Sequence, residues 1–158
     1  MLAQIVKAGL KTGAILSATT IGAIMLAGKR ETGSAWSPLN AICHIVDGDE
    51  VSQPNEFSPR ASLLGLGLNA TIMFAWATLY EGALAVTRKK SGPLPAAAAA
   101  TAAYVIDYKL VPPRYTPGIE KKIGHGSVLA VYAVLAATHA LSPLWNSYDT
   151  PSTETQAE

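Results

Sequence analysis

Hydrophobic residues in this chain gather into four long stretches that contain no Asp, Glu, Lys or Arg. These stretches are residues 12–28, 61–80, 91–106 and 123–148. About 18 uncharged apolar residues are the usual minimum for a membrane-crossing helix, because some 20 residues span a ~30 Å hydrocarbon core. The second and fourth stretches exceed this minimum. The pattern therefore predicts an all-α integral membrane four-helix bundle. We expect its spans to cover about residues 5–27, 61–86, 94–108 and 123–145.

The third expected span is short and rich in alanine, so we expect it to pack inside the bundle. The proline pair Pro112-Pro113 and the Pro117-Gly118 turn signal follow it and break the helix. Thr116 is placed to cap a short helix that begins at Pro117. Residues 1–146 are then one transmembrane domain, and the polar tail at 147–158 is expected to be disordered.

The long first loop, residues 28–60, contains a helix-start signal at Ser37-Pro38. The apolar residues that follow are spaced three and four apart, as far as Val46, and Asp47-Gly48 is a stop signal. The loop is therefore predicted to carry a short helix over residues 38–46 that lies in the membrane interface.

Small residues recur every fourth position in the first span. One such face is formed by Gly9, Gly13 and Ser17, and a second by Ala14, Ala18 and Gly22. Small residues at this spacing let helix backbones approach closely in lipid. We expect them to pack the first helix inside its own bundle rather than to form a homodimer seam.

Composition supports a membrane protein and excludes other classes. Charged residues are 15% of the chain, against about 25% in soluble domains, and the net charge is +1. Basic nucleic-acid binders and charge-rich disordered chains are poor fits. The mean hydropathy of +0.24 is modest, which leaves a soluble alanine-rich helical bundle as the alternative.

Two questions of topology stay open at this stage. The N-terminal apolar run resembles a signal peptide, but Lys29, Arg30 and Glu31 follow it directly, which favours a retained first span. Four spans place both chain ends on one side of the membrane. Basic residues flank the spans on both sides, so their count does not decide the orientation.

Polar residues inside apolar stretches are the first candidates for function, because burying them is costly unless they are paired. Glu81 lies at the end of the second span, and His139 lies at a comparable depth in the fourth. Together with Asn69 they are candidates for a proton relay or ligand site. The structural alternative is a hydrogen bond near the interface, or a Glu81–Arg88 pair.

Two further groups of polar residues lie outside the spans. Asn40, His44 and Asp47 share one face of the predicted loop helix, a spacing that suits acid–base chemistry or docking of the loop onto the bundle. His125 is the nearest further histidine, and the set is a weak metal signal. Asp107 and Arg114 are expected to tie down the third loop, through Asp107–Arg114 or Asp107–Lys109, or to bind a small anion.

Sequence signatures of established catalytic sites are absent. The chain has no phosphate-binding glycine loop, zinc-protease motif, paired cysteines or nucleophile elbow. It also lacks the internal repeat of an inverted-repeat transporter. We therefore predict no catalytic residues, no cofactor and no bound metal.

Three segments carry a resemblance. The segments "AWSPLNAICHIVDGDE" (35–50), "YEGAL" (80–84) and "DYKLVPPRYTPGIE" (107–120) are similar to those of small uncharacterised bacterial inner-membrane proteins. The resemblance implies a multi-pass protein of the bacterial inner membrane. It nominates these candidate positions: Pro38, Asn40, His44, Glu81, Asp107, Arg114 and Pro117.

Three functions follow as hypotheses. The first is a structural or accessory role as a subunit, assembly factor or envelope-maintenance protein, with the lipid bilayer and other membrane proteins as partners and no nucleic acid. The second is a small transporter or proton-linked channel, which requires a water-filled path from Asn69 to Glu81. The third is a membrane enzyme, which requires His44, Asp47 and a third polar group in one cleft.

Overall fold

The computed structural model describes residues 1–49, 51 and 53–146, and these are helical with no strand among them. The prediction of an all-α protein is confirmed for this part of the chain. The helices are α1 (Leu2–Thr32), α2 (Ser37–Ala41), α3 (His44–Asp47), α4 (Pro59–Thr87), α5 (Pro93–Val105), the π-helix η1 (Ile106–Leu110), the 3₁₀ helices η2 (Pro113–Tyr115) and η3 (Ile119–Lys121), α6 (His125–Ala140) and the 3₁₀ helix η4 (Ser142–Leu144). The expected disordered tail at 147–158 lies outside the described residues.

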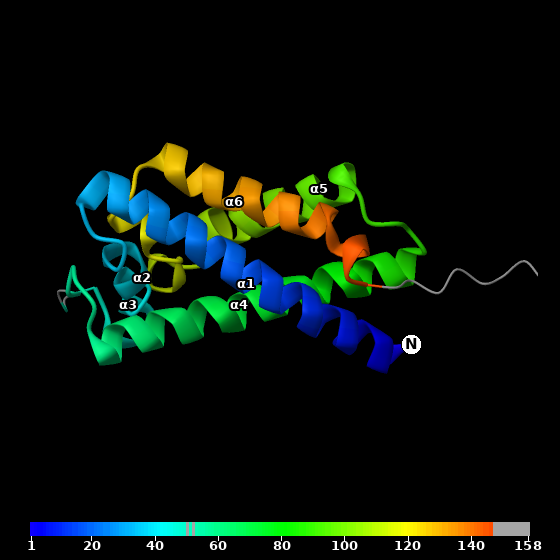
Figure 1. Ribbon diagram of the computed structural model, residues 1–158, viewed down its shortest axis with the longest axis horizontal. Helices are drawn as coiled ribbons and strands as arrows, with labels where there is room; N and C mark the ends of the chain where they lie inside the picture. Colours follow the sequence, from blue (N-terminus) through cyan, green and yellow to red (C-terminus); the bar gives the residue numbers. More distant parts are fainter. Residues whose placement is uncertain (50, 52, 147–158) are drawn as a thin grey trace, which may run out of the picture.

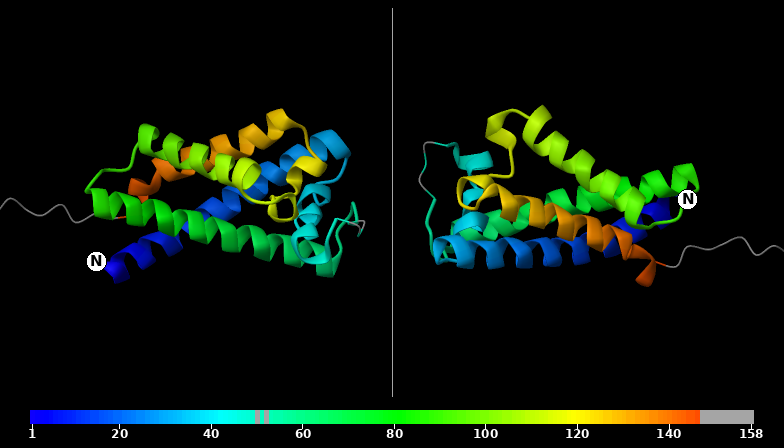
Figure 2. Two further views of the ribbon diagram at one scale, coloured as in Figure 1. Left: turned by 180° about the vertical axis from the view of Figure 1, so that it is seen from behind. Right: turned by 90° about the horizontal axis from the view of Figure 1, so that it is seen from above.

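The long helices run alternately up and down (Figure 1). The N-terminus, the 88–92 turn and the end of α6 lie at one end of the molecule, and α2, α3 and the 111–124 segment lie at the other. Helix α1 packs most extensively on α4, and α6 packs on both α1 and α5. Helices α4 and α5 contact each other little and diverge from the turn that joins them (Figure 2).

The close packing of α1 on α4 depends on glycine. A Cβ on Gly9 would lie 2.9 Å from the Thr78 Cα, and one on Gly13 would lie 3.0 Å from the Phe74 Cα. Gly9, Gly13 and Ser17 are buried, so this predicted small face packs inside the chain's own bundle. The second small face is exposed: Ala14, Ala18 and Gly22.

The loop helix departs from its prediction. Residues 37–47 form two short helices, α2 and α3, instead of a single helix over 38–46. Every residue of α2 is buried, and Gly65 of α4 lies against its Leu39 carbonyl, where a Cβ would be 2.1 Å from the oxygen. The polar face of α2 is covered by its own loop, because Asn40 Nδ2 donates to the carbonyls of Pro54 and Glu56, so α2 is docked on the bundle.

Only α1 and α4 are both long and apolar enough to cross a membrane by themselves, among the residues that the structure describes. Helix α6 is apolar but has 16 residues, and α5 has 13, against about 20 for a ~30 Å core. Helix α5 continues directly into the π-helix η1. The two long helices match the expected first and second spans, whereas the expected third and fourth correspond to shorter helices.

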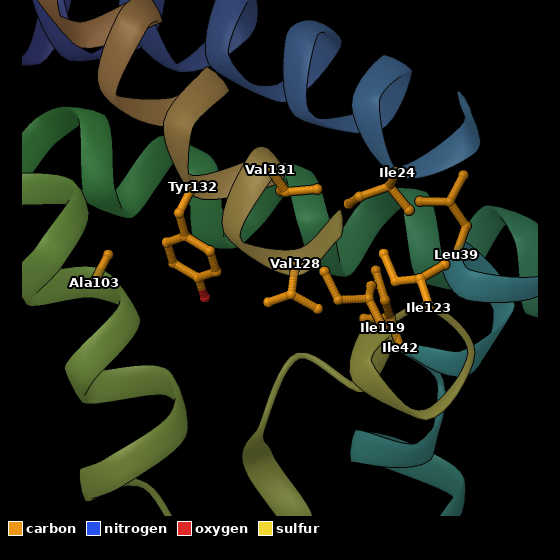
Figure 3. Close-up of a cluster of buried hydrophobic side chains, with 9 residues drawn as sticks. All are labelled: Ile24, Leu39, Ile42, Ala103, Ile119, Ile123, Val128, Val131 and Tyr132. Carbon is orange, nitrogen blue, oxygen red and sulfur yellow. The ribbon is translucent and has the colours of Figure 1, made fainter. Parts of the chain in front are cut away.

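One hydrophobic cluster joins the loop segments to the helices. It unites side chains from α1, α2, η3, α5 and α6: Ile24, Leu39, Ile42, Ala103, Ile119, Ile123, Val128, Val131 and Tyr132. Figure 3 shows Ile42 and Ile119 beside Val128, with Ile24 and Leu39 closing the other side. This cluster holds the first and third loops against the same end of the bundle.

Candidate functional site

His44 is at the centre of a polar cluster that joins the first loop to the third. Its Nε2 lies 2.8 Å from the Thr116 carbonyl oxygen, and its Nδ1 lies 2.7 Å from Asp49 Oδ1 and 2.9 Å from Lys121 Nζ. Because a carbonyl oxygen only accepts, Nε2 carries a proton and donates it. Nδ1 lies within hydrogen-bond distance of both Asp49 Oδ1 and Lys121 Nζ, and Lys121 also donates to Asp49.

This cluster has little capacity for catalysis. His44 is 2% exposed and both of its ring nitrogens are engaged. Gly118, at φ 83°, packs against the ring so closely that a Cβ would lie 2.5 Å from the His44 Cδ2. An acid–base histidine needs a substrate within hydrogen-bond reach, and the ring is enclosed. The cluster therefore fastens two loops together.

Asp47 has a different partner from His44. Its carboxylate accepts two hydrogen bonds from the Arg60 guanidinium, at 2.8 and 2.6 Å, in a bidentate pair. This places Asp47 against the start of α4, away from the His44 ring contacts. The expected convergence of His44, Asp47 and a third group in one cleft does not occur.

The acidic groups of this end are held in their charged form. Hydrogen bonding by Arg60 lowers the pKa of Asp47, with a smaller contribution from Gln53. Hydrogen bonding by Lys121, and then by His44, lowers the pKa of Asp49. Both carboxylates thus remain ionised at neutral pH and keep their basic partners in place.

Asn40 organises the rest of the first loop. Its Nδ2 donates to the carbonyls of Pro54 and Glu56, at 2.8 and 2.9 Å, and its Oδ1 accepts from Ser62 Oγ at 2.9 Å. The residue is fully buried. The polar face predicted for residues 40–47 therefore docks the loop, with each member serving a different contact.

Glu81 is buried at the opposite end of the bundle, where α1, α4 and the end of the C-terminal segment meet. Its Oε1 accepts from Thr12 Oγ1 at 2.8 Å and from Asn146 Nδ2 at 3.1 Å. Asn146 and Trp145 also donate to the Thr12 hydroxyl, at 2.9 and 3.1 Å. A carboxylate with several donors is satisfied, and here it connects three segments of the chain.

His139 does not pair with Glu81 in the way the sequence suggested. Its ring stacks on Tyr80, with centroids 4.2 Å apart, and it is 1% exposed. Within residues 1–49, 51 and 53–146, its Nδ1 has no hydrogen-bond partner. The Tyr80 hydroxyl in turn contacts Ser91 at 2.8 Å, which fastens the 88–92 turn to α6 through the His139 carbonyl.

A cavity of about 70 Å³ lies between α1, α4, α6 and the third loop. Most of its wall is aliphatic, and its polar groups come from Thr20, Asn69, Asp107 and the two tyrosines, Tyr115 and Tyr132. Two predicted site residues from different parts of the sequence, Asn69 and Asp107, are thus brought to one site. The cavity lining contains neither Glu81 nor His139.

Asp107 is held by α6 rather than by a basic residue of its own loop. Tyr132 donates a hydrogen bond of 2.6 Å to its Oδ2. The predicted pairs with Lys109 and Arg114 are not among the ion pairs of the described residues. Arg114 is exposed and lies beside Gly48.

The most important residues missed at the sequence level are Thr12, Thr20, Tyr132, Asp49 and Lys121. The first three are polar residues inside uncharged stretches, a signal that was available. Asp49 and Lys121 are surface charges, and only the fold brings them to His44.

The described residues contain no group of three His, Cys, Asp or Glu side chains that could hold a metal ion. His125, the predicted third ligand for such a site, begins α6 with its ring against Tyr104. No family model, curated protein or solved structure matches this chain.

Proposed function

We propose that this is a multi-pass protein of the bacterial inner membrane, a four-helix bundle with an accessory role. In this role it supports or assembles with other membrane components. The inner-membrane location rests on the resemblance of the 35–50, 80–84 and 107–120 segments, and the rest of the proposal on the contacts described above.

The incomplete burial of the two longest helices carries the membrane assignment. In the most apolar 18-residue windows of α1 and α4, only 33% and 28% of the residues are buried by the rest of the chain. A core helix of a soluble protein is mostly buried. Large apolar residues such as Leu63 and Leu79 are more than 60% exposed. Lipid is the solvent that makes such a surface stable.

The two shorter helices complete the bundle under this proposal. Helix α6 packs on both α1 and α5, and α5 is extended at its end by η1. Helices shorter than the hydrocarbon core are accommodated by thinning of the bilayer or by packing against longer neighbours. The four helices then place both chain ends on the same side.

The accessory role follows from the use of the buried polar residues. Asn40, His44 and Glu81 are each fully engaged in contacts that join separate segments of the chain. Residues committed in this way give rigidity, because breaking any one leaves its partners unsatisfied. A rigid scaffold with lipid-facing sides suits binding more than turnover.

Transport is the weaker alternative. It requires a polar path from Asn69 to Glu81, and the cavity that contains Asn69 has no lining residue at the Glu81 end.

Cysteine accessibility in cells tests the membrane assignment. In a Cys43→Ala background, Leu79→Cys and Lys90→Cys are treated with a membrane-impermeant maleimide, before and after cell lysis. Position 79 is 62% exposed in the isolated chain, so a water-soluble protein reacts there in lysate. We expect no reaction at position 79 until detergent is added, and reaction at position 90 in open membranes. Equal reaction at both positions without detergent would overturn the assignment.

Purification in mild detergent tests the accessory role separately. We expect a defined partner to co-purify at a fixed ratio and to be identified by mass spectrometry. A monodisperse monomer, with no partner after chemical crosslinking in intact membranes, contradicts the role.

A further inference from the structure

The cavity between α1, α4, α6 and the third loop is lined by a buried polar side chain whose hydrogen-bonding groups are only partly paired within the described residues. Asn69 is 7% exposed. In the described part of the chain, its side chain makes one hydrogen bond, a long one of 3.4 Å from Nδ2 to Thr20 Oγ1. Asn69 lines the cavity, and among these residues its Oδ1 and its second N–H have no protein partner. An amide left in this state in an apolar wall costs free energy unless something in the cavity satisfies it.

The side chains around Asn69 indicate the chemistry of the rest of the ligand. They are formed by branched aliphatic side chains and one methionine: Ile24, Ile42, Ile45, Leu68, Ile72, Met73, Ile119, Val131 and Leu135. A cavity of about 70 Å³ has room for the polar–apolar junction of one lipid chain or for several waters, but not for a complete lipid. Aliphatic walls with a single amide fit a hydroxyl or ester carbonyl attached to a chain.

The charge of the cavity lining limits the class of ligand further. Asp107 is the one charged residue among those that line the cavity, and its carboxylate is already bonded to Tyr132. No lysine or arginine lines the cavity to neutralise an anion. A fatty acid carboxylate or a phosphate would be repelled, which excludes anionic ligands, and an uncharged hydroxyl or carbonyl is what the Asn69 amide can bond.

Two residues of the cavity lining are exposed, Ile72 and Tyr115, and they indicate where a lipid chain could enter. Ile72 of α4 lines the cavity and is also 44% exposed, and α4 and α5 diverge along their length (Figure 2). Helix α4 rises about 15 Å from Pro59 to Asn69, at about 1.5 Å per residue. Asn69 therefore lies well inside the helix, on the same half of the bundle as α2.

We propose that this cavity binds an uncharged single-chain lipid, such as a monoacylglycerol, whose hydroxyl or ester carbonyl bonds Asn69 while its acyl chain leaves past Ile72. The proposal rests on the membrane location argued above, because the bilayer supplies the ligand from the side of α4. It goes beyond the accessory role in naming a ligand class and the residues that select it.

Binding of radiolabelled monoolein to the purified full-length chain in dodecyl maltoside tests the site. We expect saturable binding that approaches one molecule per chain. Oleate at pH 8 is expected to compete at least tenfold less well than unlabelled monoolein, because it carries a charge beside Asp107. Asn69→Leu is expected to weaken monoolein binding about five- to tenfold, the worth of about one hydrogen bond, and to leave competition by octadecene unchanged.

Two variants keep the test decisive. Ile72→Trp fills the mouth from an exposed position and is expected to abolish binding without unfolding the chain, so it decides the matter if Asn69→Leu fails to fold. Thr71→Val, at an exposed site on α4, is the matched control and is expected to bind as the unmodified chain does.

Non-saturable binding, or equal binding by the Ile72→Trp variant, would mean that only annular detergent or water occupies the cavity, and would overturn the proposal. Failure of the site and failure of the membrane role are separable. A chain that resists cysteine labelling at position 79 but binds no monoolein loses only the site. A water-soluble chain that binds monoolein keeps the site and loses the membrane role.

Discussion

The Thr12 hydroxyl on α1 donates a 2.8 Å hydrogen bond to the Glu81 carboxylate on α4, 69 residues away in the sequence. The same hydroxyl oxygen accepts from the side chains of Trp145 and Asn146. Three segments of the chain are therefore joined at one oxygen atom. This contact fastens the end of the bundle opposite to the loops.

Replacing Thr12 by valine is expected to destabilise the protein. Valine keeps the shape but removes both the donor to Glu81 and the acceptor for Asn146 and Trp145, which leaves buried polar groups with fewer partners. We expect a loss of about 1–2 kcal/mol in the free energy of unfolding, measured by denaturant titration in detergent. Thr71→Val is the control, since Thr71 is exposed and bonds only its own helix. Equal losses in the two variants would show that the Glu81 contact contributes nothing specific.

Adding a methyl group to Gly65 is expected to displace α2 from α4. A Cβ there would lie 2.1 Å from the Leu39 carbonyl oxygen, a backbone atom that cannot move by side-chain rotation. We expect Gly65→Ala to cost about 1–3 kcal/mol and to lower the thermal midpoint. Gly67→Ala, two residues further along α4, meets nothing within 4 Å and is expected to be neutral or slightly stabilising. Similar midpoints for the two variants would refute the close approach of α2.

Acid is expected to release the first loop. Hydrogen bonding by Arg60 lowers the pKa of Asp47 in the folded protein. The Asp47–Arg60 ion pair therefore contributes its full stability above the unfolded-state pKa of about 3.9. This stability is lost as the pH falls through the lower pKa of the folded state. Proteolysis of the loop around residues 51–58 should therefore rise below about pH 4. The Asp47→Asn variant should be cut readily at pH 7 and show less pH dependence. A loop equally resistant in both proteins at pH 7 would argue against the ion pair.

Removing the Tyr132 hydroxyl is expected to free Asp107 and the end of α5. The hydroxyl donates at 2.6 Å to a carboxylate beside the cavity, and a hydrogen bond to a charged group contributes about 1.5–3 kcal/mol. We expect Tyr132→Phe to lower the free energy of unfolding by about 1.5–3 kcal/mol. It should also increase the rate of amide hydrogen exchange in η1. Tyr115→Phe, at an exposed tyrosine, is the comparison that should leave both unchanged. No change in exchange on losing the Tyr132 hydroxyl would show that α6 does not hold η1.

Some parts of the candidate site could be read from the sequence and others could not. Glu81, His139 and Asn69 stood out because an isolated polar residue in an apolar stretch is costly to bury, and all three are buried. Their partners did not stand out. The similar depth of the two residues along parallel spans predicts a Glu81–His139 pair. Depth, however, does not specify the direction in which a side chain points from its helix. The rotation of α4 directs Glu81 to Thr12 instead.

The loops show the same division. Ser37-Pro38 correctly predicted where the first-loop helix begins, because helix-start signals are local. The spacing of the apolar residues in this helix did not predict that α2 is wholly buried. Its burial depends on Gly65 of α4 and on the segment that covers Asn40.

By itself, the sequence determined that the protein is helical and where its apolar segments lie, because uncharged runs and helix breakers act over a few neighbouring residues. The tertiary structure decided which segments are long enough to cross a membrane alone, which polar groups meet, and that Asn69 and Asp107 line one cavity. These properties depend on helix rotation and on contacts between residues tens of positions apart. Such contacts have no local signature, because each is set by the packing of the whole bundle and not by the neighbours of either residue.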